Sequence, residues 1–277
     1  MLKQRVITAL VLIAVLLPAL FAPMAWPFAV LSLLLIAAAG WEWARLNGAE
    51  ALALPFGMAL AGACALALWA GWGAAPPRTA WWLALFAWVL GGGLVLRRSV
   101  RGWPTLPVAL RCALGFALLF TAWLALAAAK TIGINFILSL FCLVWAADIA
   151  AYFGGRAFGR KKLAPTISPG KSWAGVWSGM LGALALAAFW LWRDSYYAID
   201  SASFYARLFE RGGVLGLVAV VVFLAAMSVV GDLFESLVKR AAGKKDSSRL
   251  LPGHGGVLDR IDALLPVFPI AMALITI

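Results

Sequence analysis

The sequence predicts an all-α, polytopic integral membrane protein with about nine transmembrane helices. Its 277 residues have a mean hydropathy of +0.97 and only 12% are charged, whereas charged residues make up about a quarter of an ordinary soluble domain. Apolar runs of roughly 20 residues recur along the chain, and each is long enough to cross a hydrocarbon core as a helix. The runs are rich in Leu and Ala and do not alternate with polar residues. Helices are therefore favoured over a closed barrel, the other structure that satisfies its backbone in lipid.

Nine hydrophobic segments define the predicted helices. Lys3 and Arg5 precede the first, as in a signal peptide, but further apolar segments follow at once, so an uncleaved helix is the simpler interpretation. The last segment is the least regular, because it contains Asp262, Pro266 and Pro269. The predicted segments are 6–24, 27–46, 51–72, 79–96, 107–129, 132–153, 173–192, 213–231 and 261–277.

The distribution of positive charge predicts the orientation. With the N-terminus in the cytoplasm, 18 of the 23 Lys and Arg residues fall in cytoplasmic segments and 5 fall outside, as the positive-inside rule requires. We therefore expect a protein of the cytoplasmic (inner) membrane. The net charge of +12 follows from this rule and from anionic headgroups, so no nucleic-acid partner is expected.

The acidic residues divide the single membrane domain, residues 1–277, into two parts. Only Glu42 and Glu50 precede Asp148, and the other nine acids follow from there. We expect residues 1–130 to be scaffold helices and residues 131–277 to be a catalytic half with cytoplasmic-side loops. Cys64 and Cys142 lie in apolar segments without ligand spacing, as does Cys112, so the cysteines are read as buried hydrophobes.

The first polar cluster lies at 145–173. A carboxylate near the bilayer centre costs about 2.5–3.5 kcal/mol, so Asp148 should face protein or water. Tyr152 follows four residues later and Arg156 one turn further, so the three share a helix face. The stripe leads from the membrane to a basic loop at 160–162. A basic loop that only obeys the positive-inside rule remains the alternative.

The stretch SPGKS, residues 168–172, is predicted to be a turn just before the next helix. Backbone N–H groups at a helix start, together with Lys171 and the hydroxyls of Ser168 and Ser172, suit a phosphate. The spacing is not that of a Walker motif, so the stretch alone does not identify a known phosphate-binding motif.

Two further clusters lie at 231–240 and 236–262. Asp232, Glu235 and Lys239 have helical spacing, which also fits an ordinary salt-bridged helix end. In the second cluster Gly253, Gly255 and Gly256 allow close approach of the backbone to a ligand, and Asp259 and Asp262 share a helix face. The alternative is a solvated loop.

Acids surrounded by cations predict a metal-assisted phosphate chemistry. Carboxylates bind Mg²⁺, and the metal with Lys and Arg would bind polyphosphate and spread the charge of a phosphoryl-type transition state. We assign Asp232 and Asp259 to the metal, with Asp262 and Asp148 as further candidate ligands.

The long pattern at 236–262 resembles the signature of the phosphatidate cytidylyltransferase (CDP-diacylglycerol synthase) family, and the stretch 145–173 is similar to that family too. The resemblance implies transfer of the cytidylyl group of CTP to phosphatidic acid, giving CDP-diacylglycerol and pyrophosphate. It also implies divalent metal dependence, with a monovalent cation as a further candidate, and a homodimer. The matching residues are Ser236, Lys239, Arg240, Lys245, Asp246, Pro252, His254, Gly255, Gly256, Asp259, Arg260 and Asp262.

The resemblance and the local chemistry together assign the remaining roles. The residues expected to be catalytic are Lys239, Arg240, Lys245, Asp246 and Arg260, of which the four cations would bind the reacting phosphates. The residues expected to bind substrate are Asp148, Tyr152, Arg156, Ser168, Lys171, Ser172, Ser236, His254, Gly255 and Gly256. His254 is marked by the resemblance alone. The alternatives are an ion-coupled transporter, for which a carboxylate in a span would mark the ion path, and another CTP-dependent lipid enzyme such as a polyprenol kinase.

Overall fold

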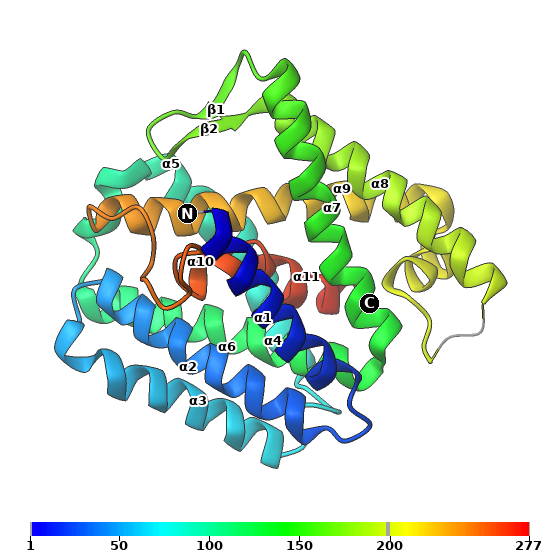
Figure 1. The fold of residues 1–277 in the computed structure, drawn as a ribbon, viewed down its shortest axis with the longest axis horizontal. Helices are drawn as coiled ribbons and strands as arrows, with labels where there is room; N and C mark the ends of the chain where they lie inside the picture. The colour runs from blue at the N-terminus through cyan, green and yellow to red at the C-terminus, as the bar shows by residue number, and fades with distance from the viewer. Residues whose placement is uncertain (1, 198–199, 277) are drawn as a thin grey trace.

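A computed structural model describes residues 2–197 and 200–276, which form a bundle of helices with one short β-hairpin (Figure 1). Short 3₁₀ turns at Glu50–Leu52 and Trp103–Thr105 flank longer helices, and a π-helical turn at Ala87–Gly92 joins α4 to α5. The elements are α1 (Leu2–Phe21), α2 (Trp26–Leu46), α3 (Ala53–Trp69), α4 (Arg78–Phe86), α5 (Gly93–Gly102), α6 (Val108–Ile132), α7 (Ile134–Phe158), β1 (Lys162–Ala164), β2 (Ser168–Ser172), α8 (Trp173–Tyr196), α9 (Phe204–Ala241), α10 (Leu258–Ile261) and α11 (Leu264–Ile275).

Within the described residues, seven segments are long and apolar enough to cross a membrane. They overlap seven of the predicted segments, and five of them agree to within about five residues at each end. Arg78–Thr105 ends nine residues beyond the predicted 96, and α9 is longer than predicted at both ends. The prediction of a polytopic helical protein is confirmed at this level. The seven are Trp26–Leu46, Glu50–Trp69, Arg78–Thr105, Val108–Ile132, Ile134–Phe158, Trp173–Tyr196 and Phe204–Ala241. The apolar part of α1, Val6–Phe21, and α11 are shorter.

The predicted ninth span, residues 261–277, is not confirmed. Helix α11 has 12 residues, which rise about 18 Å, whereas a hydrocarbon core is about 30 Å thick. Nearly all its side chains are buried, because it packs against α9, α6 and α4. Its apolar character therefore reflects a place in the protein core. Residue 277 lies outside the described part of the chain.

Helices α7, α8 and α9 pack together and carry most of the predicted site residues. Helix α8 approaches α7 closely: a Cβ at Gly179 would lie 2.9 Å from the carbonyl oxygen of Ala147. Helix α9 kinks at Gly213, where φ is +58°, and then continues to Ala241. It therefore extends ten residues beyond the predicted end at 231, and the acids and cations of 232–240 lie on a continuous helix.

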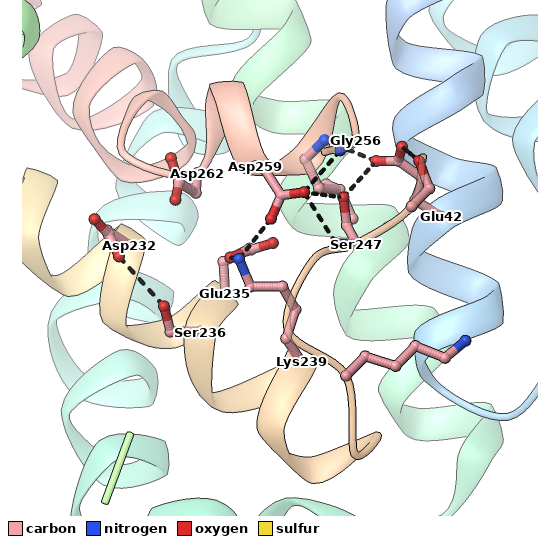
Figure 2. A network of polar contacts seen from close by, with 12 residues as sticks. Glu42, Asp232, Glu235, Ser236, Lys239, Ser247, Gly256, Asp259 and Asp262 are labelled. Carbon is pink, nitrogen blue, oxygen red and sulfur yellow. Dashed lines mark hydrogen bonds and ion pairs between the residues drawn. The ribbon is translucent and has the colours of Figure 1, made fainter. Parts of the chain in front are cut away.

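The polar segments converge at one end of the bundle. Helix α7 runs there into the hairpin β1–β2, whose strands pair antiparallel with Lys162 opposite Ser172. The hairpin reaches α5 through the hydroxyls of Ser99 and Thr166, 3.3 Å apart. The end of α2 and the loop 242–257 after α9 meet at the same end, as the network in Figure 2 shows.

An aromatic cluster fixes α2 against α9 just below that end. The ring of Trp43 stacks on Phe234, with centroids 6.0 Å apart, and Trp103 meets Phe234 edge-on at 5.4 Å. Asn47, fully buried, accepts a hydrogen bond from Trp103 Nε1 at 2.8 Å and donates one to the carbonyl of Trp43 at 2.8 Å. The buried indole and amide are thereby satisfied, as low-dielectric surroundings require.

Candidate active site

A cavity of 580 Å³ opens between α7, the hairpin and α9. Asp148, Tyr152 and Arg156 all line it, so the predicted shared helix face is confirmed, and Asp148 is exposed there. The cavity combines cations and carboxylates in one polar space. Its lining residues are Asp148, Ala151, Tyr152, Gly155, Arg156, Lys162, Leu163, Gly170, Lys171, Ser172, Gly175, Val176, Val229 and Asp232.

The hairpin supplies one cation that reaches α9. Lys171 Nζ lies 2.6 Å from Asp232 Oδ2, with both side chains partly exposed. The other oxygen, Asp232 Oδ1, accepts a hydrogen bond from Ser236 at 3.3 Å. Lys171 therefore places a movable ammonium at the cavity wall beside a carboxylate.

The stretch 168–172 forms strand β2, not the predicted turn. Ser172 is buried and caps α8, where its hydroxyl accepts the backbone N–H of Gly175 at 3.2 Å. Ser168 pairs with Ala164 in the hairpin and does not line the cavity. Ser172 lines the cavity while it caps α8, so the predicted role of its hydroxyl with a phosphate stays a prediction, as does that of Ser168. Lys171 is the residue of this stretch that offers a charge to the cavity.

Lys239 lies between two carboxylates (Figure 2). Its ammonium is 2.5 Å from Glu235 Oε2 and 2.5 Å from Asp259 Oδ1. Burial acts to raise the pKa of Asp259, but hydrogen bonds from Lys239 and from the backbone N–H groups of Gly256 and Ser247 outweigh it and lower that pKa. The Lys239 charge is thus neutralised inside the protein, and its geometry favours positioning Asp259 over direct contact with a phosphate.

Glu42, at the end of α2, holds the loop that follows α9. Its side chain is fully buried. Oε1 accepts from Ser248 Oγ at 2.5 Å and Val257 N at 2.9 Å, and Oε2 accepts from Ser247 Oγ at 3.1 Å and Leu258 N at 2.7 Å. A buried carboxylate with four donors nearby is satisfied, and one residue anchors both the middle of the loop and the point where it enters α10.

The two glycines of the signature are explained by this packing. Gly255 has φ +86°, in the left-handed region that glycine favours, and a Cβ there would collide with the Asp259 carboxylate. A Cβ at Gly256 would overlap Ser247 Oγ and Glu42 Oε1. The glycines therefore allow the loop to close on these two carboxylates, a role other than the predicted contact with substrate.

Asp232 and Asp262 lie beside each other (Figure 2). Asp262 accepts one hydrogen bond, from the N–H of its neighbour Ala263 at 2.8 Å. Burial, followed by the nearby charge of Asp232, raises the pKa of Asp262 above its usual range. Two adjacent carboxylates with so few donors provide a place for a cation.

The predicted ligand set for Mg²⁺ is only partly assembled. Among the described residues no group of three or more His, Cys, Asp or Glu side chains is arranged to hold a metal, and Asp259 is occupied by Lys239 and backbone donors. Mg²⁺ usually binds one or two carboxylates together with substrate phosphates. The pair Asp232 and Asp262 fits that mode, and Asp259 does not.

The chain matches the model of the cytidylyltransferase family over residues 3–277. The chain belongs to this family. It is 42% identical over 281 residues to a phosphatidate cytidylyltransferase of Pseudomonas aeruginosa, which covers 99% of this chain and 97% of that protein. It is 47% identical over 137 residues to a Haemophilus influenzae protein of the same name, covering 50% and 44%. An Arabidopsis thaliana chloroplastic phosphatidate cytidylyltransferase is 37% identical over 173 residues, covering 58% and 39%.

Other predicted residues of this family member lie away from the cavity. Lys245 and Asp246 are exposed and line a separate cavity. Arg240, also exposed, donates to the carbonyl of Lys244 at 3.1 Å, and Arg260 is exposed on α10. Their catalytic roles stay predictions.

His254 belongs to the turn of the loop. Its backbone N–H donates to Leu251 O at 2.8 Å, within the bridge that pairs Leu251 with Gly255. Its Nδ1 is buried without a partner among the described residues. Any residue except proline could make this backbone bond, so it does not explain a histidine here, and the role of His254 with substrate stays a prediction.

Three residues of the network were missed from the sequence as site residues: Glu42, Ser247 and Ser248. One signal could have indicated Glu42, since an acid in an apolar segment needs a partner and Glu42 is one of only two acids before Asp148. No pattern could have named its partners, because they lie more than 200 residues away.

We predict that Glu42→Gln lowers kcat by about 10–100-fold, the range seen when a residue that orients site ligands is lost. Either orientation of the amide turns its NH₂ toward one backbone N–H donor, Val257 or Leu258, and so leaves that donor unsatisfied. Steady-state kinetics on the purified protein test this. Glu210→Gln, which makes the same change at an exposed position, should keep kcat unchanged, and wild-type kcat in Glu42→Gln would contradict the positioning role.

Proposed function

We propose that the protein transfers the cytidylyl group of CTP to phosphatidic acid, giving CDP-diacylglycerol and pyrophosphate. The observation that carries the proposal is the cavity at the end of the bundle, where Arg156, Lys162 and Lys171 face Asp148 and Asp232. Family membership and the names of the relatives point to the same reaction. They do not favour a transporter or a polyprenol kinase.

The chemistry needs charge neutralisation more than a base. An oxygen of the lipid phosphate attacks the α-phosphorus of CTP, a new P–O bond forms, and the bond to the β-phosphate bridging oxygen breaks to release pyrophosphate. A phosphomonoester has a second pKa of about 6, so it is largely dianionic at neutral pH. No proton has to be removed from the nucleophile, and positioning supplies most of the rate enhancement.

The cations of the cavity bind the phosphates. Lys171 turns from Asp232 to a phosphate oxygen, and Arg156 can offer paired N–H donors, which suit phosphate geometry. Lys162 adds a third positive charge at the hairpin edge. Tyr152 is 60% exposed, and its hydroxyl accepts a hydrogen bond from Arg156 at 3.4 Å. Its ring presents an aromatic surface at the mouth of the cavity, where a lipid would enter.

Asp232 and Asp262 would hold a Mg²⁺ ion at the inner edge of the cavity. When bound, the ion polarises phosphoryl oxygens and neutralises their charge. Asp259, kept ionised by Lys239 and backbone N–H groups, orients α10 and so fixes the position of Asp262, three residues on.

The orientation follows from the two substrates. CTP is soluble and phosphatidic acid lies in the bilayer, so the cavity belongs at the cytoplasmic interface of the inner membrane, with the N-terminus cytoplasmic. The resemblance also implies a homodimer. A particle mass equal to that of one chain, measured in mild detergent, would contradict this.

Labelled CTP tests the reaction directly. With purified protein and phosphatidic acid vesicles, ³²P at the α-position should enter lipid, and ³²P at the γ-position should appear only in pyrophosphate. Entry of γ-label into lipid would indicate a kinase and would sink the proposal, as would the absence of any CTP-dependent lipid product.

Asp262→Asn tests the metal pair. Losing even an outer-shell partner costs about 10–100-fold in metal affinity, so the loss of a direct ligand should raise the Mg²⁺ concentration needed for half-maximal rate by at least tenfold. Titration of Mg²⁺ at saturating CTP measures this, with Glu210→Gln as the matched loss of one acid. An unchanged Mg²⁺ dependence would remove Asp262 from the metal site.

Thiol labelling tests the orientation. In a variant lacking Cys64, Cys112 and Cys142, a cysteine in place of exposed Arg249 should react with reagent supplied from the cytoplasmic side only. A cysteine in place of Glu210, exposed near the start of α9, should react from the opposite side only. The reverse labelling pattern would show that the protein lies in the membrane with the opposite orientation.

A further inference from the structure

A second cavity, of 600 Å³, lies between the loop 242–257 and the end of α2. It contains four cations and one acid, and none of its lining residues lines the first cavity. Its lining consists of Trp41, Arg45, Lys244, Lys245, Asp246, Ser247, Ser248, Arg249 and Leu250. We call it the basic cavity.

The cations of the basic cavity are available to a ligand. Lys244, Lys245 and Arg249 are exposed and form no ion pair with the residues that the structure describes. Arg45 stacks over the ring of Trp41 at 4.5 Å and pairs with exposed Glu50 at 3.2 Å. The basic cavity therefore carries a net positive charge, which favours an anion as its ligand.

An apolar groove continues from the basic cavity along α2 and α3. The groove, of 260 Å³, shares Trp41 and Leu250 with the basic cavity. Leu54 and Met58 on its wall are 66% and 65% exposed. Its other lining residues are Ala37, Ala38 and Gly57, which leave a shallow floor between the two helices.

We propose that the basic cavity and this groove together bind an anionic phospholipid, outside the catalytic cavity. The phosphate contacts the Lys and Arg side chains, and an acyl chain lies in the groove. Charge complementarity and the shared residues Trp41 and Leu250 favour this occupant. A free nucleotide would leave the groove empty, and an apolar helix of another protein would leave the cations unmatched.

The site is connected to catalysis through the loop. Ser247 belongs to the basic cavity and also donates to Asp259 from its backbone N–H, at 2.9 Å. Ser248, also in the cavity lining, donates to Glu42 at 2.5 Å. A lipid phosphate held by Lys244 and Arg249 therefore restrains the segment that carries Ser247 and Ser248. It favours the arrangement of the loop in which these residues bond to Asp259 and Glu42.

Retention of lipid by the purified full-length protein tests the proposal. The protein is exchanged into nonionic detergent with phosphatidylglycerol, phosphatidic acid or phosphatidylcholine, without CTP, and bound lipid is measured by native mass spectrometry. Phosphatidylglycerol should be retained in preference to phosphatidylcholine. Losing two surface cations should reduce that retention by about tenfold or more, since each contributes about 1 kcal/mol.

Two variants and a matched control separate the parts of the site. Lys244→Gln with Arg249→Gln removes charge, and Ala38→Trp fills the groove without changing charge; each should lower retention. Arg97→Gln with Arg98→Gln removes two exposed cations at the same end of the bundle and should leave retention unchanged.

The two lipid sources give different results. Retention of both anionic lipids supports a site for bulk anionic phospholipid, and variant-sensitive retention of phosphatidic acid alone supports the site with substrate as its occupant. Equal retention of phosphatidylcholine, or retention unaffected by either variant, would overturn the proposal. The measurement needs no turnover, so its failure is distinct from failure of cytidylyl transfer in the labelled-CTP assay.

Discussion

The contact between Glu42 and the loop after α9 is the constraint on which the candidate site depends. One buried carboxylate on α2 accepts hydrogen bonds from Ser247 and Ser248 in the middle of the loop and from Val257 and Leu258 where the loop ends and α10 begins. Hydrogen bonds to a charged group contribute about 1.5–3 kcal/mol each, and leaving such a group buried without partners costs more. The loop therefore has one favourable arrangement. That arrangement starts α10 at Leu258 and so sets where Asp259 and Asp262 lie.

A second carboxylate extends this control toward the cavity. Asp259 accepts from Ser247 and Gly256 of the loop and pairs with Lys239 of α9. The Ser247 hydroxyl oxygen lies 3.1 Å from a Glu42 oxygen and 2.9 Å from an Asp259 oxygen. Its one proton can be donated to only one of the two carboxylates at a time. Chains of polar contacts of this kind are rigid when satisfied. The buried charges thus hold α2, α9 and α10 together, while Lys171, Arg156 and Lys162 stay available at the cavity for a substrate.

The sequence predicted well those features that are determined within a single helix. The apolar runs gave helices because lipid leaves few other structures possible, and the spacing of Asp148, Tyr152 and Arg156 gave one cavity face because helix geometry is regular. Features that depend on distant contacts were not predictable. The sequence did not indicate that Ser172, expected at a phosphate, also caps α8. Nor did it indicate that Lys239, expected at a substrate, lies between Glu235 and Asp259. The segment 261–277 has the composition of a span, but it is apolar because α11 is buried within the bundle.

The loop 242–257 lines the basic cavity but not the cavity beside α7, and the two cavities differ in composition. Toward α7 and the hairpin, three cations and two carboxylates line one cavity, which suits a reaction in which several phosphates and a metal must meet and separate. Toward α2 and α3, cations dominate beside an apolar groove, which suits an amphiphile that stays bound. Ser247 and Ser248 line the basic cavity and also donate hydrogen bonds to Asp259 and Glu42, so an anion bound in the basic cavity would act on the same backbone that positions Asp259. The dense charge of residues 236–262 therefore includes a buried frame around Lys239 and Asp259 and exposed cations, Lys244, Lys245 and Arg249, that line the basic cavity.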